Sequence, residues 1–341
     1  MLDFPGFDQH IADSISRGDL QQARSLVHQW LQLWATSLPQ QPTRRDLRQP
    51  ELWRSLALVV EHTNDHFLIE RFWQILERCA PQPESQDILP LLGIPILNRP
   101  DLLAQLLESL DHPVDHLAIV DNSVLPQANA GKESPRAPTE VQRYLEALCQ
   151  LGHPLVNHVH VARPFRNLGV AASWNLILSS FPEARIALLA NNDVRFAPDV
   201  LKSSLSRMDA TRPQVLQLLP SPAGFSAFLL TALCWDRLGL FDPNFHPAYG
   251  EDLDYRDRIR ANPEVEEIDA GFAHQAMLDL NPLQSATIAS DPALFRFNQT
   301  SFALNRLWYF SHRRLRQDCR GTWRRLWLAQ WSDDPEREDV H

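Results

Sequence analysis

Cysteine is scarce in this sequence of 341 residues, which contains only Cys79, Cys149, Cys234 and Cys319. The four lie far apart, and no two form the closely spaced pair that structural zinc sites and thioredoxin-like redox motifs require. The spacing also disfavours a disulfide-stapled fold and fits a reducing compartment. We therefore expect a cytoplasmic protein without a cysteine-based metal or redox centre.

Long apolar segments and an excess of basic charge are missing as well. The longest apolar run, residues 223–235, is shorter than the roughly 20 residues that a membrane-spanning helix needs. The N-terminal residues MLDFPGFDQH lack the basic flank and apolar core of a signal peptide. Acidic residues outnumber basic ones by 42 to 32, and this net charge of −10 argues against a general nucleic-acid-binding protein.

The hydrophobic content of 44% is enough for one large domain or two ordinary ones. We expect three regions, with boundaries at 1–88, 89–288 and 289–341. The first is predicted to be helical, because apolar residues recur at helical spacing over residues 20–34 and a second helical stretch covers residues 51–79. No repeat is visible at periods of 20 to 50 residues.

The middle region alternates short apolar runs with helical patterns. Strands are expected at 88–97, 116–123, 156–162 and 184–194, and helices at 101–110, 139–151 and 169–181. This alternation predicts an α/β fold with a mostly parallel sheet flanked by helices. Ligands bind such sheets beyond the carboxyl ends of the strands, so the last residues of each strand are the place to look for chemistry.

Polar residues follow three of the expected strands. They are Asn98 and Arg99, then Asp121, and then Asn191, Asn192 and Asp193. The two carboxylates would face one crevice, where they could bind a ribose hydroxyl and a divalent cation such as Mg²⁺ or Mn²⁺. The alternative is that each aspartate only starts a turn.

Two further segments are candidates for a site. Asn167 and Gly169 precede the helix at 169–181, and a helix N-terminus favours a phosphate, although an ordinary turn and cap would look the same. In the acidic cluster YGEDLDYRDR, the adjacent Glu251 and Asp252 could supply a general base, or could serve only as helix-start acids. His274 is a candidate ligand for metal or phosphate, or a structural histidine.

Taken in order, these motifs resemble the inverting family 2 glycosyltransferases of the GT-A fold, in particular rhamnosyltransferase-like members. The resemblance covers about residues 92–275. It lies in the segments IPILNRPDLLAQLLESL, AIVDNS, RNLGVAASWN and LLANNDV, and in the stretch that ends in AYGEDLDYRDR. It implies a hexosyltransferase that uses a nucleoside-diphosphate sugar and a carbohydrate or lipid-linked acceptor, as in polysaccharide biosynthesis.

The resemblance also implies a role for individual residues. Asp252 would be the general base and Glu251 would orient it or the acceptor, while Asp193 and His274 would hold the metal on the diphosphate. The residues implied for the nucleotide sugar are Pro95, Asn98, Arg99, Asp121, Asn167, Gly169, Asn175, Asn191 and Asn192. Three features depart from the family. Asn191 stands where the family's Asp-x-Asp motif has a carboxylate, the loop at 124–138 is long and rich in Pro and Ala, and residues 1–88 match nothing in the family.

The implied reaction is a single displacement at the anomeric carbon with inversion, in which Asp252 deprotonates the acceptor hydroxyl. A nucleotidyltransferase is one alternative, but no Gly-rich loop with a lysine follows the first strand, where ILNRPD stands. A non-catalytic GT-A-like binding or scaffold protein is another, and the Glu251–Asp252 pair argues against it.

The C-terminal region is basic and aromatic. Seven Arg and four Trp lie between Arg306 and Trp331, with Asp318 as the one acid among them. On a helix, Trp323 and Trp327 would share one face. That face could lie on an anionic membrane surface or pack against the rest of the protein.

Overall fold

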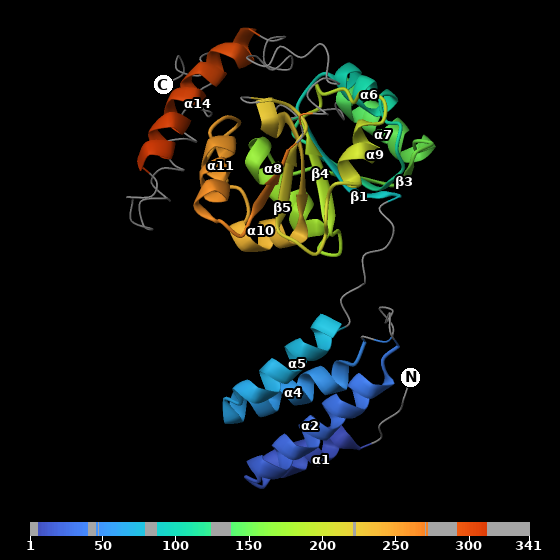
Figure 1. Ribbon diagram of the computed structural model, residues 1–341, viewed down its shortest axis with the longest axis vertical. Helices are drawn as coiled ribbons and strands as arrows, with labels where there is room; N and C mark the ends of the chain where they lie inside the picture. The colour runs from blue at the N-terminus through green and yellow to red at the C-terminus, as the bar shows by residue number, and fades with distance from the viewer. Residues whose placement is uncertain are drawn as a thin grey trace, which may run out of the picture. The chain divides into compact units, whose positions relative to one another are not determined.

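The computed structural model describes residues 6–39, 46, 48–78, 87–123, 138–220, 223–269, 271 and 292–311. The chain divides into two compact units, Met1–Glu84 and Ser85–His341. Figure 1 shows the helices of the first unit in blue and the sheet with its helices in the other colours. Among the described residues, no helix is both long and apolar enough to cross a membrane.

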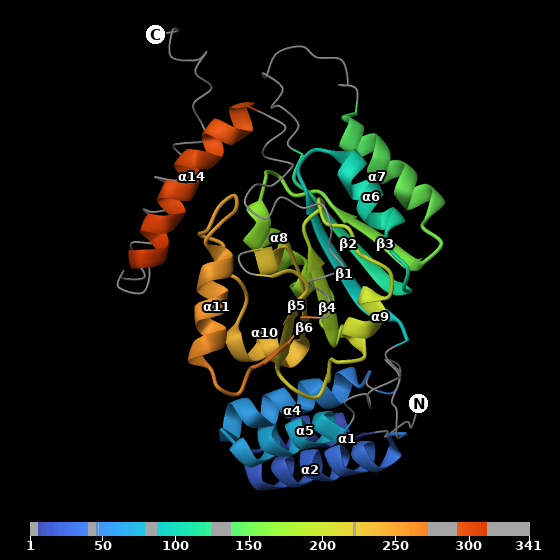
Figure 2. The same ribbon diagram turned by 45° about the horizontal axis from the view of Figure 1, so that its top comes forward.

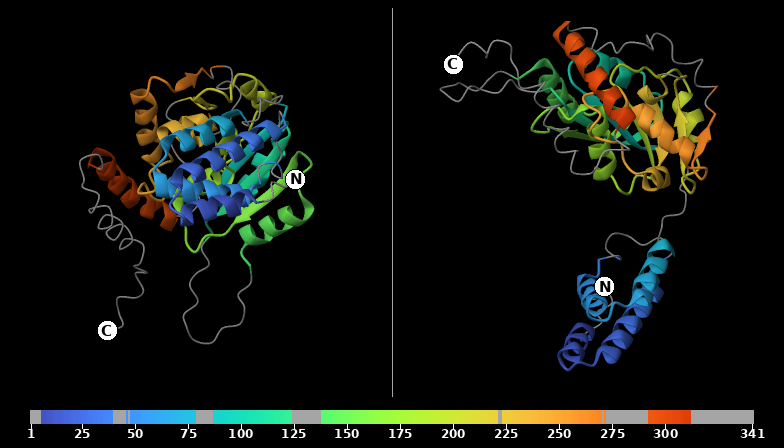
Figure 3. Two further views of the ribbon diagram at one scale, coloured as in Figure 1. Left: turned by 90° about the horizontal axis from the view of Figure 1, so that it is seen from below. Right: turned by 90° about the vertical axis from the view of Figure 1, so that its left-hand side faces the viewer.

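The first unit consists of α1 (Phe7–Ser16), α2 (Leu20–Ser37), α4 (Pro50–Thr63) and α5 (His66–Arg78). Its core gathers the apolar faces of these helices around Trp34, which is almost fully buried. The ring of Trp53 packs edge-on against Trp34 with centroids 4.9 Å apart. The helical expectation for this region is confirmed, and Figure 3 shows the unit from two further sides.

The stretch expected to be one helix at 51–79 is two helices. Asn64 takes the left-handed conformation with φ 49° and ends α4. Asp65 then begins α5, because its Oδ1 accepts hydrogen bonds from the backbone N–H groups of Phe67 at 3.0 Å and Leu68 at 3.4 Å. The Asn-Asp pair that interrupts the helix is visible in the sequence as a turn signal.

The second unit is built on one sheet in the order β3-β2-β1-β4-β6-β5-β7. The strands are β1 (Leu89–Ile96), β2 (Val114–Asp121), β3 (Val156–Ala162), β4 (Ile186–Ala190), β5 (Gln214–Gln217), β6 (Ala227–Thr231) and β7 (Glu266–Ile268). Only β6 runs antiparallel to its neighbours among these strands. The mostly parallel sheet flanked by helices confirms the fold class predicted from the sequence.

Helices cover both faces of the sheet (Figures 1 and 2). One face carries α6 (Pro100–Glu108), α7 (Glu140–Leu151) and α9 (Val200–Leu205), and the other carries α8 (Gly169–Ser180), α10 (Ala232–Leu238) and α11 (Glu251–Ala261). Gly93 of β1 lets α8 approach closely, since a Cβ there would lie 2.7 Å from Ile177 Cγ2.

The strand ends meet as the topology requires. Ile96, the last residue of β1, lies opposite Asp121, the last residue of β2. The strand expected at 184–194 ends at Ala190, so Asn191 to Asp193 form a turn beyond it. Because β6 is antiparallel to β4, the short 3₁₀ helix η1 (Ala223–Ser226) before β6 lies at the same edge.

The helix α14 (Pro292–Ser311) belongs to the second unit and lies beside α11 (Figures 1 and 2). Trp308 is buried, and its Nε1 donates a hydrogen bond to Asp242 Oδ2 at 2.8 Å. This part of the C-terminal region therefore packs against the α/β unit. Trp323, Trp327 and the arginines from Arg313 to Arg325 lie outside the described residues, so the membrane expectation remains a prediction.

Candidate functional site

Asp121 is held at the end of β2 by two sets of contacts. Its Oδ1 accepts hydrogen bonds from the backbone N–H of Ser123 at 2.9 Å and from the Ser123 hydroxyl. Its Oδ2 lies 3.5 Å from Nε of Arg163, just beyond β3. The side chain is nearly buried, so the carboxylate is fixed in place. Sequence reasoning missed Arg163, although a cation directly after a strand was a usable signal.

The ends of β1 and β4 are linked by a side chain. Asn192 is buried, and its Nδ2 donates a hydrogen bond to the carbonyl oxygen of Asn98 at 3.3 Å. Arg99 begins α6 in the left-handed conformation and forms an ion pair with Asp101 at 2.6 Å. The pKa of Arg99 is raised chiefly by this hydrogen-bonded pair, with a smaller contribution from the charge of Asp193. Asp193 thus lies within electrostatic reach of Arg99.

Two other predicted residues occupy the same edge. Pro95 is buried within β1, opposite Val120 of β2. Asn191 is the first residue of the turn after β4, and its backbone N–H donates to the carbonyl oxygen of Ser226 at 2.8 Å. The edge of the sheet therefore brings together Pro95, Asn98, Arg99, Asp121, Asn191, Asn192 and Asp193.

Asn122 ties this edge to the start of α8. Its Nδ2 donates to the hydroxyl of Ser173 at 2.9 Å, and its Oδ1 accepts from the backbone N–H of Leu168 at 2.9 Å. Gly169 has φ +74°, and its N–H donates to Asn167 Oδ1 at 2.8 Å. A Cβ at Gly169 would lie only 2.6 Å from the carbonyl oxygen of Pro247. The glycine is therefore required for close approach of the 246–250 loop.

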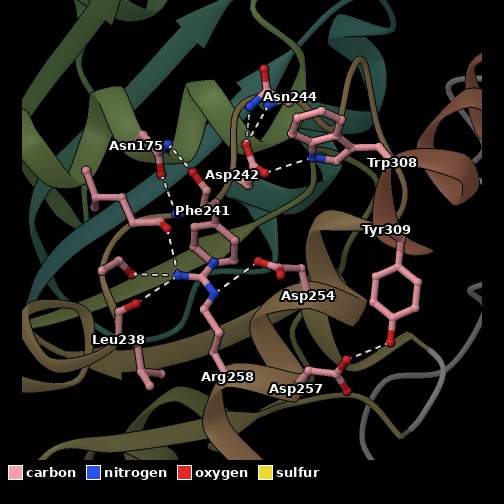
Figure 4. Close-up of polar contacts among 12 residues, drawn as sticks. Asn175, Leu238, Phe241, Asp242, Asn244, Asp254, Asp257, Arg258, Trp308 and Tyr309 are labelled. Carbon is pink, nitrogen blue, oxygen red and sulfur yellow. Dashed lines mark hydrogen bonds and ion pairs between the residues drawn. The ribbon is translucent and has the colours of Figure 1, made fainter. Parts of the chain in front are cut away.

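Asn175 has a structural partner. Its Nδ2 donates to the carbonyl oxygen of Phe241 at 2.7 Å, and its Oδ1 accepts from the N–H of Phe241 at 2.9 Å. Figure 4 shows this reciprocal pair. Both polar atoms of the side chain thus fasten the loop before α11 to α8.

The 246–250 loop, residues His246 to Gly250, leads into α11 and contacts the first turn of α8, where the N–H of Val170 donates to the carbonyl oxygen of Pro247 at 2.7 Å. Its His246–Pro247 peptide bond is cis, and His246 Nε2 lies 3.1 Å from the carbonyl oxygen of Asn167. Asn305 of α14 holds the other side. Its Nδ2 donates to the carbonyl oxygens of His246, Ala248 and Tyr249 at 3.2, 2.9 and 2.9 Å. Asn305 is 1% exposed, and nothing in the sequence alone marked it.

The loop delivers Glu251 and Asp252 to the first turn of α11. Glu251 is 6% exposed, and its Oε2 has no hydrogen-bond partner among the described residues. Burial, and then the neighbouring charge of Asp252, raise the pKa of Glu251 to about 8. Asp252 is only partly buried, and its Oδ1 accepts from the N–H of Gly250 at 3.2 Å. Burial therefore favours the neutral form of Glu251 in this pair.

The rest of α11 is anchored firmly (Figure 4). Arg258 donates to the carbonyl oxygens of Leu238 at 2.8 Å and Leu240 at 2.9 Å, and pairs with Asp254 at 3.0 Å. The Tyr309 hydroxyl of α14 donates to Asp257 at 2.6 Å. Asp254 and Asp257 of the acidic cluster therefore have structural partners.

The described residues do not assemble a complete metal site. No group of three or more His, Cys, Asp or Glu side chains in this part of the chain is placed to hold an ion. Asp193 supplies one carboxylate at the sheet edge, and His274 lies outside the described residues. Metal binding by this pair stays a prediction.

Comparisons with known proteins give limited likenesses. No protein-family model and no curated protein sequence matches the chain. The crystal structure of S. aureus TarS residues 1–349 in complex with UDP-GlcNAc is 13% identical, covering 62% of this chain and 65% of that one, with a TM-score of 0.39. The crystal structure of TarS 1–349 is 14% identical over 52% of this chain and 57% of that one, with a TM-score of 0.38.

A third solved structure is the inositol-1-phosphate CTP transferase from T. maritima. It is 13% identical, covers 60% of this chain and 94% of that one, and has a TM-score of 0.37. The chain spans 57% to 65% of the two TarS 1–349 chains.

Proposed function

We propose that this protein is a glycosyltransferase, which transfers a sugar from a nucleoside-diphosphate sugar to an acceptor hydroxyl. The observation that carries the proposal is the placement of Glu251 and Asp252. A buried neutral acid stands beside a partly exposed carboxylate, on a helix start tied to the sheet edge through Gly169 and Asn122. The resemblance of the motifs to family 2 glycosyltransferases supports the same conclusion.

In the proposed reaction, Asp252 removes the proton of the acceptor hydroxyl as its oxygen attacks the anomeric carbon. The bond from that carbon to the diphosphate breaks on the opposite side, so the configuration inverts. Glu251 keeps its proton at neutral pH and can donate a hydrogen bond that orients Asp252 or the acceptor. Asp121 and the 167–169 segment bind the nucleotide part of the donor.

A divalent cation, Mg²⁺ or Mn²⁺, would neutralise negative charge on the leaving diphosphate. Asp193 is the described residue proposed to hold it, and His274 is the second proposed ligand. Arg99 lies close enough to Asp193 to influence the same diphosphate. The type of sugar, including the rhamnosyltransferase-like assignment, rests on the resemblance alone.

The proposal is tested with Asp252→Asn. A thermal-shift screen of UDP-, GDP-, dTDP- and CDP-sugars first identifies the donor. The variant should then lose about 10²- to 10⁴-fold in turnover while donor affinity stays nearly unchanged. Asp236→Asn, an exposed aspartate on α10, is the matched control and should transfer sugar normally.

Product analysis separates the rival functions. Release of a nucleoside diphosphate together with a glycosylated product supports the proposal. Release of pyrophosphate would indicate a nucleotidyltransferase instead. Donor binding without any transfer by the unaltered protein would favour a binding or scaffold role.

A further inference from the structure

Arg256 lies on the same face of α11 as Asp252, and one nitrogen of its guanidinium has no hydrogen-bond partner among the described residues. The two residues are four apart, so they lie one helical turn from each other. The Nη2 atom of Arg256 is buried and makes no hydrogen bond to any residue that the structure describes. No ion pair joins Arg256 to a described carboxylate. Its neighbour Arg258 also has a buried Nη2 without a hydrogen bond, but the rest of that guanidinium is paired, with Nη1 bound to backbone carbonyls and Nε to Asp254.

The fold places Arg256 at the edge of the sheet where the candidate site lies. Its Cζ stands 5.6 Å from the ring centre of Phe225, in η1. The next residue, Ser226, accepts the backbone hydrogen bond from Asn191, the first residue after β4. The guanidinium therefore contacts η1, the segment whose last residue is hydrogen-bonded to the turn after β4.

A buried, permanently charged donor without an acceptor destabilises the folded protein. The Phe225 ring attracts the cation but offers Nη2 no hydrogen-bond acceptor. A buried polar group without a hydrogen bond is rare in folded proteins, and a bound ligand that supplies the missing acceptor would explain this one. Guanidinium groups bind phosphate and carboxylate through paired hydrogen bonds.

We propose that Arg256 binds an oxyanion of the acceptor substrate, a phosphate or a carboxylate, about one helical turn from the hydroxyl that Asp252 deprotonates. This inference rests on the proposed function, since it takes Asp252 as the residue that faces the acceptor. It assigns the acceptor to the anionic class. It also gives Arg256 a role that the motifs of the sequence did not indicate.

Calorimetric titration of the full chain with methyl phosphate, and separately with acetate, tests the proposal. Arg256→Gln should weaken binding of whichever probe the unaltered protein binds by about ten- to a hundredfold, as expected for a hydrogen bond to a charged group. Arg260→Gln, an exposed arginine one turn further along α11, is the matched control and should bind as before. The melting temperature of Arg256→Gln should be no lower, because an unpaired cation has been removed.

Three results would overturn the proposal. The first is that Arg256→Gln binds the probe as tightly as the unaltered protein does. The second is that the unaltered protein binds neither probe. The third is that Arg256→Gln binds UDP more weakly but binds the probe unchanged, which would assign Arg256 to the donor. If Arg256→Gln fails to fold, Arg256→Lys decides instead. It keeps the charge and stem, so affinity for the bound probe should be intermediate, and unchanged affinity would contradict the assignment. If no nucleoside diphosphate binds the unaltered protein, the proposed function fails, whereas the probe titrations still report on Arg256 itself.

Discussion

The protonation state of Glu251 leads to a prediction about stability. Its pKa is about 8 in the folded protein against an ordinary value of 4.5, so between these values the folded state retains a proton that the unfolded state has released. The free energy of unfolding therefore falls as the pH rises from 4.5 to 8, by about 1.4 kcal/mol per unit. Below 4.5 both states are protonated, and above 8 both are ionised, so the contribution is constant outside this window.

Glu251→Gln removes this titration, because the amide stays neutral at every pH. We compare the free energy of unfolding of the variant minus that of the unaltered protein. This difference should be about 3 kcal/mol larger at pH 7 than at pH 4. Urea unfolding at a series of pH values measures the difference directly. Glu140→Gln, on the exposed first turn of α7, is the control and should show no such slope. A difference that does not change between pH 4.5 and 8 would refute the assignment of a neutral Glu251.

Three further predictions follow from other parts of the unit. Asp193→Ala should weaken Mn²⁺-dependent binding of the nucleoside diphosphate and make it insensitive to EDTA, and equal binding by the unaltered protein in EDTA would remove the metal role. Gly169→Ala should lower the free energy of unfolding by about 2 kcal/mol or more, because of the positive φ and the clash with Pro247, and urea unfolding would detect it. Burial, with the charges of His116 and His158, lowers the pKa of His160, so the unfolded state binds more protons just below pH 6.5 and His160 destabilises the folded protein as the pH drops below that value, opposite in sign to the contribution of Glu251. His160→Gln should therefore gain stability relative to the unaltered protein as the pH drops below 6.5, and an unchanged difference between the two proteins in urea unfolding would refute this.

The sequence by itself determined the first four strands of the middle region and the helices between them, whereas β5, β6, β7 and the antiparallel direction of β6 were not predicted. The apolar runs ending at Ile96, Val120 and Ala190 are long enough, and sufficiently flanked by turn residues, to specify β1, β2 and β4. Parallel strands bring their carboxyl ends to one edge, so the grouping of Asn98, Asp121 and Asn192 followed from the alternation of strands and helices. In these strands the local hydrophobic pattern and the topology of the sheet favour the same structure, so the sequence alone predicts them.

Only the tertiary structure decided which groups are buried, paired or left without a partner. Glu251 and Arg256 look like ordinary surface charges on a helix start, and their environment comes from η1, the 246–250 loop and the packing of α11 on the sheet. Asn305 lies more than 50 residues beyond the loop that it holds, and its bonds to three carbonyl groups depend on where α14 packs. Burial and hydrogen bonding are properties of the assembled chain, because the atoms that remove water from a group are distant in sequence.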